Sequence, residues 1–314
     1  MRRAGIAMAL VAGVLLSVGC GAPQPRAEGA EDVPKTIGAS LLTQTHIFYQ
    51  DMVRAMHNEA ETHDFNLRIQ YAEFDMRKQN DHMEMFIAQG VDAIILAPVE
   101  SSGVTPVVAE ARAAGIPVFT ADIAAHDADV VCHIASDNFQ GGVILGEYLA
   151  KLLDGKGKVA IIDHPSVESV QQRTAGFNEA MKAYPGIEIV QRVPGEGQRD
   201  KALKAAQDIL QAHRDLDAIF GINDDSALGA LAAVEEAGLE DRIVIVGFDG
   251  TPEALRVIKK GSALKADTAQ FPEEIGRTTI RTIAAYFRGE EVPAEAPVKV
   301  EIFDQARLQA EQES

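Results

Sequence analysis

Residues 91–122 read VDAIILAPVESSGVTPVVAEARAAGIPVFTAD, and this stretch contains the pattern that decides the fold. Two short apolar runs, 91–98 and 117–122, flank a segment whose apolar residues recur at helical spacing. Strand, helix and strand in this order are typical of a parallel sheet, because parallel strands need a crossover connection that is usually a helix. The runs are apolar throughout, as expected when helices cover both faces of the sheet. The stretch therefore predicts an α/β fold.

The same alternation continues from residue 36 to the C-terminal region. Apolar runs predict eleven strands, at 36–42, 67–74, 91–98, 117–122, 131–137, 158–164, 187–194, 218–224, 243–250, 263–270 and 298–303. So many strands are too many for one compact sheet in a chain of this length. We therefore predict two similar lobes, each with a doubly wound parallel sheet of five or six strands. A (β/α)₈ barrel is the competing fold, but it predicts only about eight strands.

The chain is expected to pass between the two lobes three times. The text SDNFQGG around residue 137 offers Asn138 as a helix N-cap together with two glycines, which suits a first crossing. The second crossing is expected at 268–272 and the third in the loop 289–297. The resulting division gives an N-terminal lobe of residues 36–137 plus 270–292 and a C-terminal lobe of residues 138–269 plus 293–314.

The first twenty residues form a separate unit. MRRAGIAMALVAGVLLSVGC has two arginines, an apolar stretch and small residues that end at Cys20, which is the layout of a secretory signal. Its ending, LSVGC, resembles a bacterial lipobox, in which the cysteine is acylated. A transmembrane anchor is the alternative, but the apolar stretch is short for crossing a bilayer. We expect a lipoprotein signal over 1–20 with lipidated Cys20, then a flexible tether over 21–35.

Charge and cysteine content exclude several classes. The chain of 314 residues carries a formal net charge of −18 and has no basic stripe, so nucleic-acid binding is not expected. Once Cys20 is lipidated, Cys132 has no partner for an internal disulfide, and its apolar surroundings indicate a buried structural cysteine. Neighbouring residues of a strand face opposite ways, so Cys132 and His133 make a poor metal site.

Familiar catalytic patterns are missing from the sequence. There is no GxSxG elbow, no Walker loop, no GxGxxG opening a helix after a strand, and no HExxH. We therefore expect no enzyme activity, no metal and no cofactor.

Side chains at the ends of the predicted strands point instead to a binding site. Ligands of open parallel sheets bind beyond the carboxyl ends of the strands. Carboxylates, amides and rings gather at these ends, which are Thr43–Tyr49, Asp122, His164, Asn223–Asp224, Phe248–Asp249 and Gln270. Carboxylates and amides bond hydroxyl groups, while rings stack against apolar C–H faces, and a sugar presents both surfaces. Any single Asp or Asn here is as often a turn or cap residue, but together they indicate a sugar-like ligand.

Several stretches together resemble a known family. They are GVDAIILAP, AGIPVFTAD, VCHIASDNFQGG, RTAGF, INDDSALGAL, VGFDGTPEAL and TAQFPEEIG. The sequence resembles the periplasmic sugar-binding proteins of ABC transporters, of the ribose-binding type, from about residue 36 to 304. The resemblance implies the type I periplasmic binding protein fold, which is LacI-like, with a three-strand hinge that closes the lobes around one small ligand.

The resemblance also implies a set of ligand-binding residues. Phe48 and Tyr49 match an aromatic pair, and Phe248 matches a ring of the opposing lobe, so that these rings would sandwich a sugar. The other matching positions, which would bond hydroxyls, are Asp122, Arg173, Asn223, Asp249 and Gln270.

Three departures from the family pattern argue against ribose itself. His46 stands where the ribose binders have asparagine, Ile123 where they have arginine, and Gly197 where they have phenylalanine. His46 is retained as a ligand-binding candidate. We expect a neutral pentose, hexose or cyclic polyol.

The expected function is that of an extracytoplasmic solute-binding lipoprotein, a monomer by resemblance, that delivers its ligand to an ABC permease. A sensor that feeds a chemoreceptor or histidine kinase is the alternative. A LacI-type regulator would need an N-terminal DNA-binding helix-turn-helix, where this chain has a signal and tether. A glycosidase would use Asp122 and Asp249 as an acid/base pair.

Overall fold

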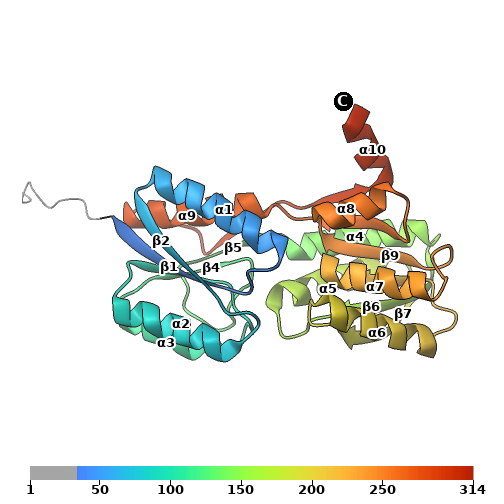
Figure 1. Ribbon diagram of the computed structural model, residues 1–314, viewed down its shortest axis with the longest axis horizontal. Helices are drawn as coiled ribbons and strands as arrows, with labels where there is room; N and C mark the ends of the chain where they lie inside the picture. Colours follow the sequence, from blue (N-terminus) through green and yellow to red (C-terminus); the bar gives the residue numbers. More distant parts are fainter. Residues whose placement is uncertain (1–33, 314) are drawn as a thin grey trace, which may run out of the picture. The chain divides into compact units, whose positions relative to one another are not determined.

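The computed structural model describes residues 34–313, which fold into two α/β lobes (Figure 1). The expected signal, Cys20 and the tether up to residue 33 lie outside the described residues. Within 34–313, no helix combines the length and the apolar character needed to cross a membrane.

Each lobe is built on one six-stranded sheet. The first sheet has the order β11-β5-β4-β3-β1-β2, with β1 Lys35–Leu41, β2 Phe65–Tyr71, β3 Ala93–Leu96, β4 Val118–Ala121, β5 Cys132–Ser136 and β11 Glu295–Val298. The second sheet has the order β12-β10-β9-β8-β6-β7, with β6 Lys156–Asp163, β7 Gly186–Pro194, β8 Ala218–Gly221, β9 Val244–Asp249, β10 Leu264–Ala269 and β12 Glu301–Asp304. All pairs are parallel except β10 with β12. The structure confirms the predicted class of two doubly wound lobes.

Helices cover both faces of each sheet. In the first lobe α1 (Ile47–Thr62) packs beside α9 (Pro272–Phe287), while α2 (Met76–Gln89) and α3 (Thr105–Ala113) lie on the opposite face (Figure 1). The second lobe has the pairs α4 with α5 and α6 with α7, and α8 packs beside α10. Their bounds are α4 Asn138–Leu152, α5 Glu168–Met181, α6 Arg199–Ala212, α7 Asp224–Glu236, α8 Pro252–Lys259 and α10 Gln305–Glu313. Because both faces are covered, central strands such as β3, with sequence AIIL, are buried along their whole length.

The chain crosses between the lobes after β5, after β10 and after β11. The predicted strand 298–303 is wrong in one respect: it is two short strands, of which β11 pairs with β5 and β12 pairs with β10. The third crossing therefore follows Val298, later than the expected loop 289–297, and β11 belongs to the first sheet. Asp137, not Asn138, is the N-cap of α4, because its carboxylate accepts the backbone N–H of Gln140 at 3.0 Å.

The predicted structural cysteine is confirmed. Cys132 lies fully buried on β5 as a free thiol. Burial, and then the charge of Glu295, raise the pKa of the Cys132 thiol to about 11, so it stays protonated and unreactive near neutral pH.

Candidate functional site

A cavity of about 70 Å³ lies between the lobes, where strands of both sheets end. Its walls carry eight of the nine residues predicted for ligand binding: His46, Phe48, Tyr49, Asp122, Arg173, Asn223, Asp249 and Gln270. The cavity is called the cleft below. Side chains from both lobes reach it, because the carboxyl ends of the two sheets face the same space.

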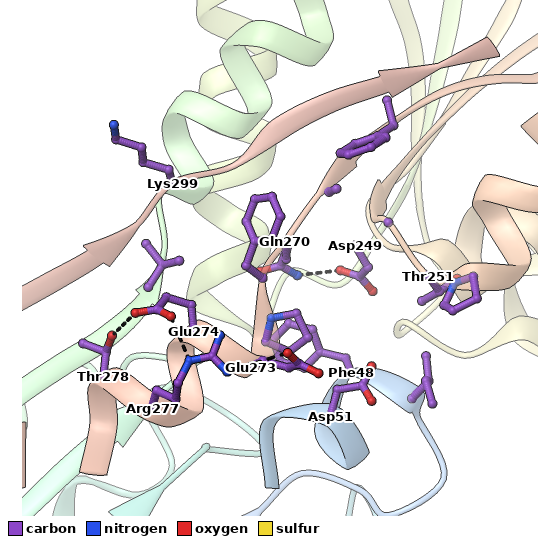
Figure 2. A pocket seen from close by; sticks show the side chains of 18 of the residues that line it. Phe48, Asp51, Asp249, Thr251, Gln270, Glu273, Glu274, Arg277, Thr278 and Lys299 are labelled. Atoms are coloured by element: carbon purple, nitrogen blue, oxygen red, sulfur yellow. Dashed lines mark hydrogen bonds and ion pairs between the residues drawn. The ribbon is translucent and has the colours of Figure 1, made fainter. Parts of the chain in front are cut away.

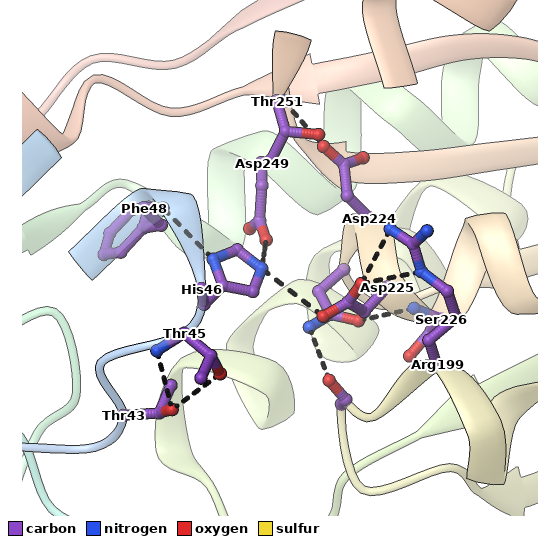
Figure 3. Close-up of polar contacts among 12 residues, drawn as sticks. Thr43, Thr45, His46, Phe48, Arg199, Asp224, Asp225, Ser226, Asp249 and Thr251 are labelled. Carbon is purple, nitrogen blue, oxygen red and sulfur yellow. Dashed lines mark hydrogen bonds and ion pairs between the residues drawn. The ribbon is translucent and has the colours of Figure 1, made fainter. Parts of the chain in front are cut away.

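The first wall begins with the N-terminus of α1. His46 is the N-cap of this helix, and its Nδ1 accepts the backbone N–H of Phe48 at 3.2 Å. A neutral His46 ring therefore carries its hydrogen on Nε2. This Nε2 lies 3.5 Å from Asp249 Oδ2 and 3.9 Å from Asp225 Oδ2 in the other lobe (Figure 3). The helix cap thus doubles as a polar contact across the cleft.

Asp122 and Tyr49 form the polar part of the same wall. The Tyr49 hydroxyl donates to Asp122 Oδ2 at 2.6 Å, and both residues are buried. Burial raises the pKa of Asp122 to about 6, although the Tyr49 hydrogen bond and the charge of Arg173 act in the opposite direction. Phe48 packs edge-on against the Tyr49 ring, with 5.4 Å between the ring centroids, and fixes its orientation.

The opposite wall centres on Arg173 of α5. Its Nε donates to Asn138 Oδ1 at 2.8 Å, and its Nη1 donates to the carbonyl oxygen of Ile222 at 2.8 Å and to Asp249 Oδ1 at 3.3 Å. Close packing of α4 on α5 makes this possible, because a Cβ at Gly142 would lie only 2.0 Å from the Arg173 carbonyl oxygen. The guanidinium is therefore held in place before any ligand arrives.

Phe248 does not line the cleft, which differs from the predicted sugar sandwich. Its side chain is fully buried, and the Arg173 guanidinium carbon lies 4.0 Å from the ring centroid. Phe248 and Asp249 are neighbours on β9 and face opposite ways, so only Asp249 reaches the cleft. The ring supports Arg173 from behind through a cation–π contact.

Asp249 and Gln270 lie next to the segments that join the lobes. Gln270 Nε2 donates to Asp249 Oδ1 at 2.6 Å (Figure 2), and the Gln270 backbone N–H donates to the Asp249 carbonyl at 2.9 Å. The other side-chain atom of Gln270, Oε1, is buried without a hydrogen-bond partner. Buried acceptors are normally satisfied, so Oε1 is a position for a donating ligand group.

Asn223 occupies the end of β8. Its Oδ1 accepts the backbone N–H of Ser226 at 2.9 Å as the cap of α7, and its Nδ2 donates to the Gly197 carbonyl at 3.2 Å. Both ends of this amide already have a protein partner, so Asn223 presents less free hydrogen-bonding capacity than Asp122 or Gln270.

The cleft also contains residues that sequence reasoning did not select as ligand-binding. Phe74, His164 and Glu196 are the largest or most polar of these. Burial lowers the pKa of His164, which favours its neutral form. His164 is named among the strand ends but is not among the residues predicted to bind ligand, and Phe74, which ends the predicted strand 67–74, follows the same rule; Glu196 lies in a loop and carries no such signal.

The lobes touch at the edge of the cleft through Ser101. Its backbone N–H donates to the Ser166 carbonyl at 3.2 Å, and its Oγ accepts the backbone N–H of Glu168 at 2.9 Å. Glu168 is the first residue of α5, whose own N-cap, Val167, supplies no side-chain hydrogen bond. A serine of the first lobe therefore caps a helix of the second.

A larger groove of about 790 Å³ lies beside the connecting segments (Figure 2). Its polar side chains mostly bond one another: Glu274 pairs with Arg277 at 2.9 Å and accepts the Thr278 hydroxyl at 3.3 Å. Phe48, Asp249 and Gln270 line both spaces, but the other predicted ligand-binding residues of the cleft line only the cleft, so the cleft is the better candidate. Within residues 34–313, no group of three or more His, Cys, Asp or Glu side chains has the arrangement to hold a metal ion.

Comparisons with known proteins agree with this geometry. Residues 37–291 match the family model described as periplasmic binding protein domain. The ribose import binding protein RbsB of Bacillus subtilis strain 168 is 34% identical over 269 residues, covering 85% of this chain and 87% of that protein.

Two solved structures are similar over most of the chain. A solute-binding protein of an ABC transporter from Bacillus halodurans, with bound myo-inositol, has a TM-score of 0.84 at 28% identity and covers 91% of this chain and 99% of its own. A periplasmic solute-binding protein from Actinobacillus succinogenes, with bound D-allose, has a TM-score of 0.81 at 29% identity, covering 88% and 99%. This chain belongs to the periplasmic binding proteins of the ribose-binding type, the sugar- and polyol-binding solute-binding proteins of ABC transporters, and it is a binding protein and not an enzyme.

Proposed function

We propose that this chain captures a neutral monosaccharide or cyclic polyol in the cleft and delivers it to an ABC permease. The observation that carries the proposal is the convergence of Asp122, Arg173, Asp249 and Gln270 on one space. All four side chains are buried, yet they come from both lobes. Paired donors and acceptors beside the rings of Phe48 and Tyr49 suit a ligand with many hydroxyls and apolar C–H faces.

The charges in the cleft favour a ligand without a negative charge. Asp122, Asp249 and Glu196 face a single guanidinium, that of Arg173, which already lies 3.3 Å from Asp249. A phosphate group needs several unengaged cationic donors, and Arg173 is already committed to three acceptors. We therefore expect sugar phosphates to bind at least 100-fold more weakly, which corresponds to about 3 kcal/mol.

The size of the cleft supports a hinged mode of binding. Pockets for small ligands usually have about 300 Å³ or more, whereas the cleft here has about 70 Å³. A ring-sized ligand would enter only after the lobes move apart, and closing them again would bring both walls onto it.

Delivery to a permease and attachment to the membrane complete the proposal. The protein would be an extracytoplasmic monomer anchored by the lipid on Cys20, in the periplasm of a cell with two membranes. Replacement of Cys20 by Ala tests the anchor: the protein should move from the membrane fraction to the soluble extracytoplasmic fraction. Retention of the C20A variant in the membrane would contradict lipid anchoring.

Ligand binding is tested by a thermal-shift screen. Residues 34–314 form one compact unit, so a chain that starts after the signal keeps the whole fold. The screen compares D-ribose, D-allose, myo-inositol, xylitol and ribose 5-phosphate. A ligand at about 100 times its Kd should stabilise the fold by about 2.7 kcal/mol.

We expect a shift with at least one neutral compound and none with the phosphate. An exposed-site variant, Asp208→Asn on α6, should show the same shift as the unmodified protein. Stronger stabilisation by the sugar phosphate than by every neutral compound would overturn the proposal.

A further inference from the structure

Two carboxyl groups lie buried beneath the loop that carries Asp249. Asp224 begins α7 and Asp267 belongs to β10, and their exposed fractions are 1% and 0%. Asp224 Oδ1 and Asp267 Oδ2 are both buried without a hydrogen-bond partner. A Cβ at Gly247 would lie 3.3 Å from the first of these oxygens and 2.4 Å from the second, so both line the same small space.

The remaining oxygen of each carboxyl group holds the loop. Asp267 Oδ1 accepts the backbone N–H of Gly250 at 2.8 Å, and Asp224 Oδ2 accepts the backbone N–H of Thr251 at 2.6 Å (Figure 3 shows the second contact). Asp249 and Gly250 have φ values of 128° and 75°, a conformation that non-glycine residues rarely adopt. The two carboxyl groups therefore hold the backbone of this loop in a rarely adopted conformation directly beside the cleft.

Two ionised carboxylates cannot satisfy each other, because each only accepts hydrogen bonds. One proton placed between them supplies the missing donor and removes one buried charge. Burial raises the pKa of Asp267 to about 6, and burial followed by the charge of Asp267 raises the pKa of Asp224 well above its ordinary range.

The surrounding charges do not remove the need for that proton. Asp249 raises the pKa of both groups, and Arg173 of α5 is the cation that acts on Asp267. On the N-terminal side, His46 faces Asp249 and Asp225, and Arg199 of α6 faces Asp225, so the Arg199 charge is engaged by another carboxylate (Figure 3).

We propose that Asp224 and Asp267 share a single proton, and that this pair positions Asp249 by holding the loop 249–251. Both are positioning residues that act through Asp249 and do not reach the cleft. Loss of the shared proton leaves two facing negative charges, and their repulsion displaces the loop and weakens ligand binding. The consequence for affinity rests on the proposed function, whereas the shared proton does not.

The sign of the pH dependence follows from the raised pKa values. Carboxyl groups that hold their protons more tightly when folded stabilise the fold at low pH, and this stabilisation is lost as pH rises through the folded-state pKa. Stability and affinity should therefore both fall on the alkaline side of neutrality, although the proposed ligands have no titrating group there.

The first experiment uses the ligand-free protein, so it stands whatever the ligand is. Asp267→Asn keeps an oxygen for the Gly250 N–H and places an amide N–H where the proton lay. The urea-unfolding free energy of the unmodified protein should fall, as pH rises from about 6 upward, more steeply than that of D267N. The free energy of unfolding of the control variant Asp208→Asn should fall with pH as steeply as that of the unmodified protein.

Infrared spectroscopy tests the proton directly. At about pH 8, where Asp122, with a pKa of about 6, is ionised, the unmodified protein should show a carbonyl band of a protonated carboxylic acid, and D267N should lack it. Equal pH slopes for D267N and the unmodified protein, or a band retained in D267N and also in Asp224→Asn, would overturn the shared proton.

The second experiment measures the affinity for whichever compound of the screen binds. Asp267→Ala should weaken binding at least about tenfold, which corresponds to about 1.4 kcal/mol, and Asp267→Asn should restore it to within about threefold. In D267N the affinity should also become independent of alkaline pH. If Asp267→Asn does not restore the affinity, although the infrared band shows the shared proton, the positioning role alone is contradicted. If no compound of the screen binds, the proposed function alone is contradicted.

Discussion

The two walls of the cleft are built differently. In the second lobe, Arg173 has three hydrogen-bond acceptors and the Phe248 ring behind it. In the first lobe, the carboxylate of Asp122 receives one side-chain hydrogen bond, from Tyr49, and burial raises its pKa to about 6. One wall is complete without ligand, whereas the other keeps a buried charge that is poorly compensated.

This difference indicates that the two walls contribute to binding in different ways. A preorganised wall lowers the entropy cost of binding, because its groups are already ordered. An under-satisfied wall gains more when a ligand hydroxyl arrives, because a buried acceptor without enough donors is costly. We expect Arg173 to contribute to both stability and affinity, and Asp122 mainly to affinity.

The largest effect is expected from Arg173→Met. The substitution leaves Asp249, the Asn138 Oδ1 and the Ile222 carbonyl short of a donor, and losing one partner of a buried pair costs about 3–5 kcal/mol. Urea unfolding should show a loss of this size, and calorimetry should show no measurable ligand binding. The control is Arg281→Met, whose exposed ion pair with Glu59 should be worth at most about 1 kcal/mol. Equal losses for the two variants would remove the contrast between the walls.

Asp122→Asn should separate stability from affinity. The folded-state pKa of Asp122 is raised from 3.8 to about 6, so its protonated form is favoured in the fold. The stabilisation is present below about pH 4 and is lost as pH rises through about 6, by at most about 3 kcal/mol. In urea unfolding, the free energy of the Asn variant should not show this loss between about pH 4 and about pH 6. The same variant should bind the ligand more weakly by about 2 kcal/mol. A variant that is less stable than the unmodified protein at neutral pH would contradict this.

Tyr49→Phe should sharpen the comparison within the first wall. Removing the hydroxyl takes away a hydrogen bond to Asp122, which costs about 1.5 kcal/mol of stability when the acceptor is charged. Because this bond lowers the pKa of Asp122, the acidic midpoint of the stability profile should move to higher pH. Tyr71→Phe on β2 is the control. An unchanged midpoint in the Tyr49 variant would show that Asp122 has another donor.

The smallest effect is expected at the contact between the walls. Ser101→Ala removes the hydroxyl that caps α5 from the other lobe, and loss of an N-cap costs about 1 kcal/mol. The cap joins the two lobes, so an opening of the lobes would break it, and ligand affinity of the variant should fall about fivefold, measured by calorimetry. The control is the exposed neighbour, Ser102→Ala. A variant with unchanged affinity would mean that the two lobes close without this contact.

Much of the fold could be predicted from the sequence. The apolar strands and the helical segments between them appear as local periodicity, which a single chain reveals. Asp122 and Asp249 could be placed near the cleft because the carboxyl ends of parallel strands share one edge of the sheet. The same rule names His164, which is not among the residues predicted to bind ligand, and it also applies to Phe74, which sequence reasoning left out.

What could not be predicted depends on packing between distant segments. Phe248 adjoins Asp249, and which of the two faces the cleft is set by how β9 sits in its sheet. Asp224, which follows β8, and Asp267 of β10 come together because β9 lies between these two strands; Asp224 has the strand-end signal, but nothing local pairs it with Asp267. Ser101 lies in a loop after β3, and its contact with α5 exists only when both lobes are present.

The cap from Ser101 to α5 also bears on how faithfully this protein reports its ligand. A hydrogen bond of about 1 kcal/mol between the lobes favours the closed form roughly fivefold, whether or not a ligand is bound. A transporter that recognises only closure would count closed molecules without ligand as loaded. The strength of this one contact therefore sets the fraction of ligand-free protein that is closed. A weaker cap would lower that fraction and would also lower the affinity for the ligand.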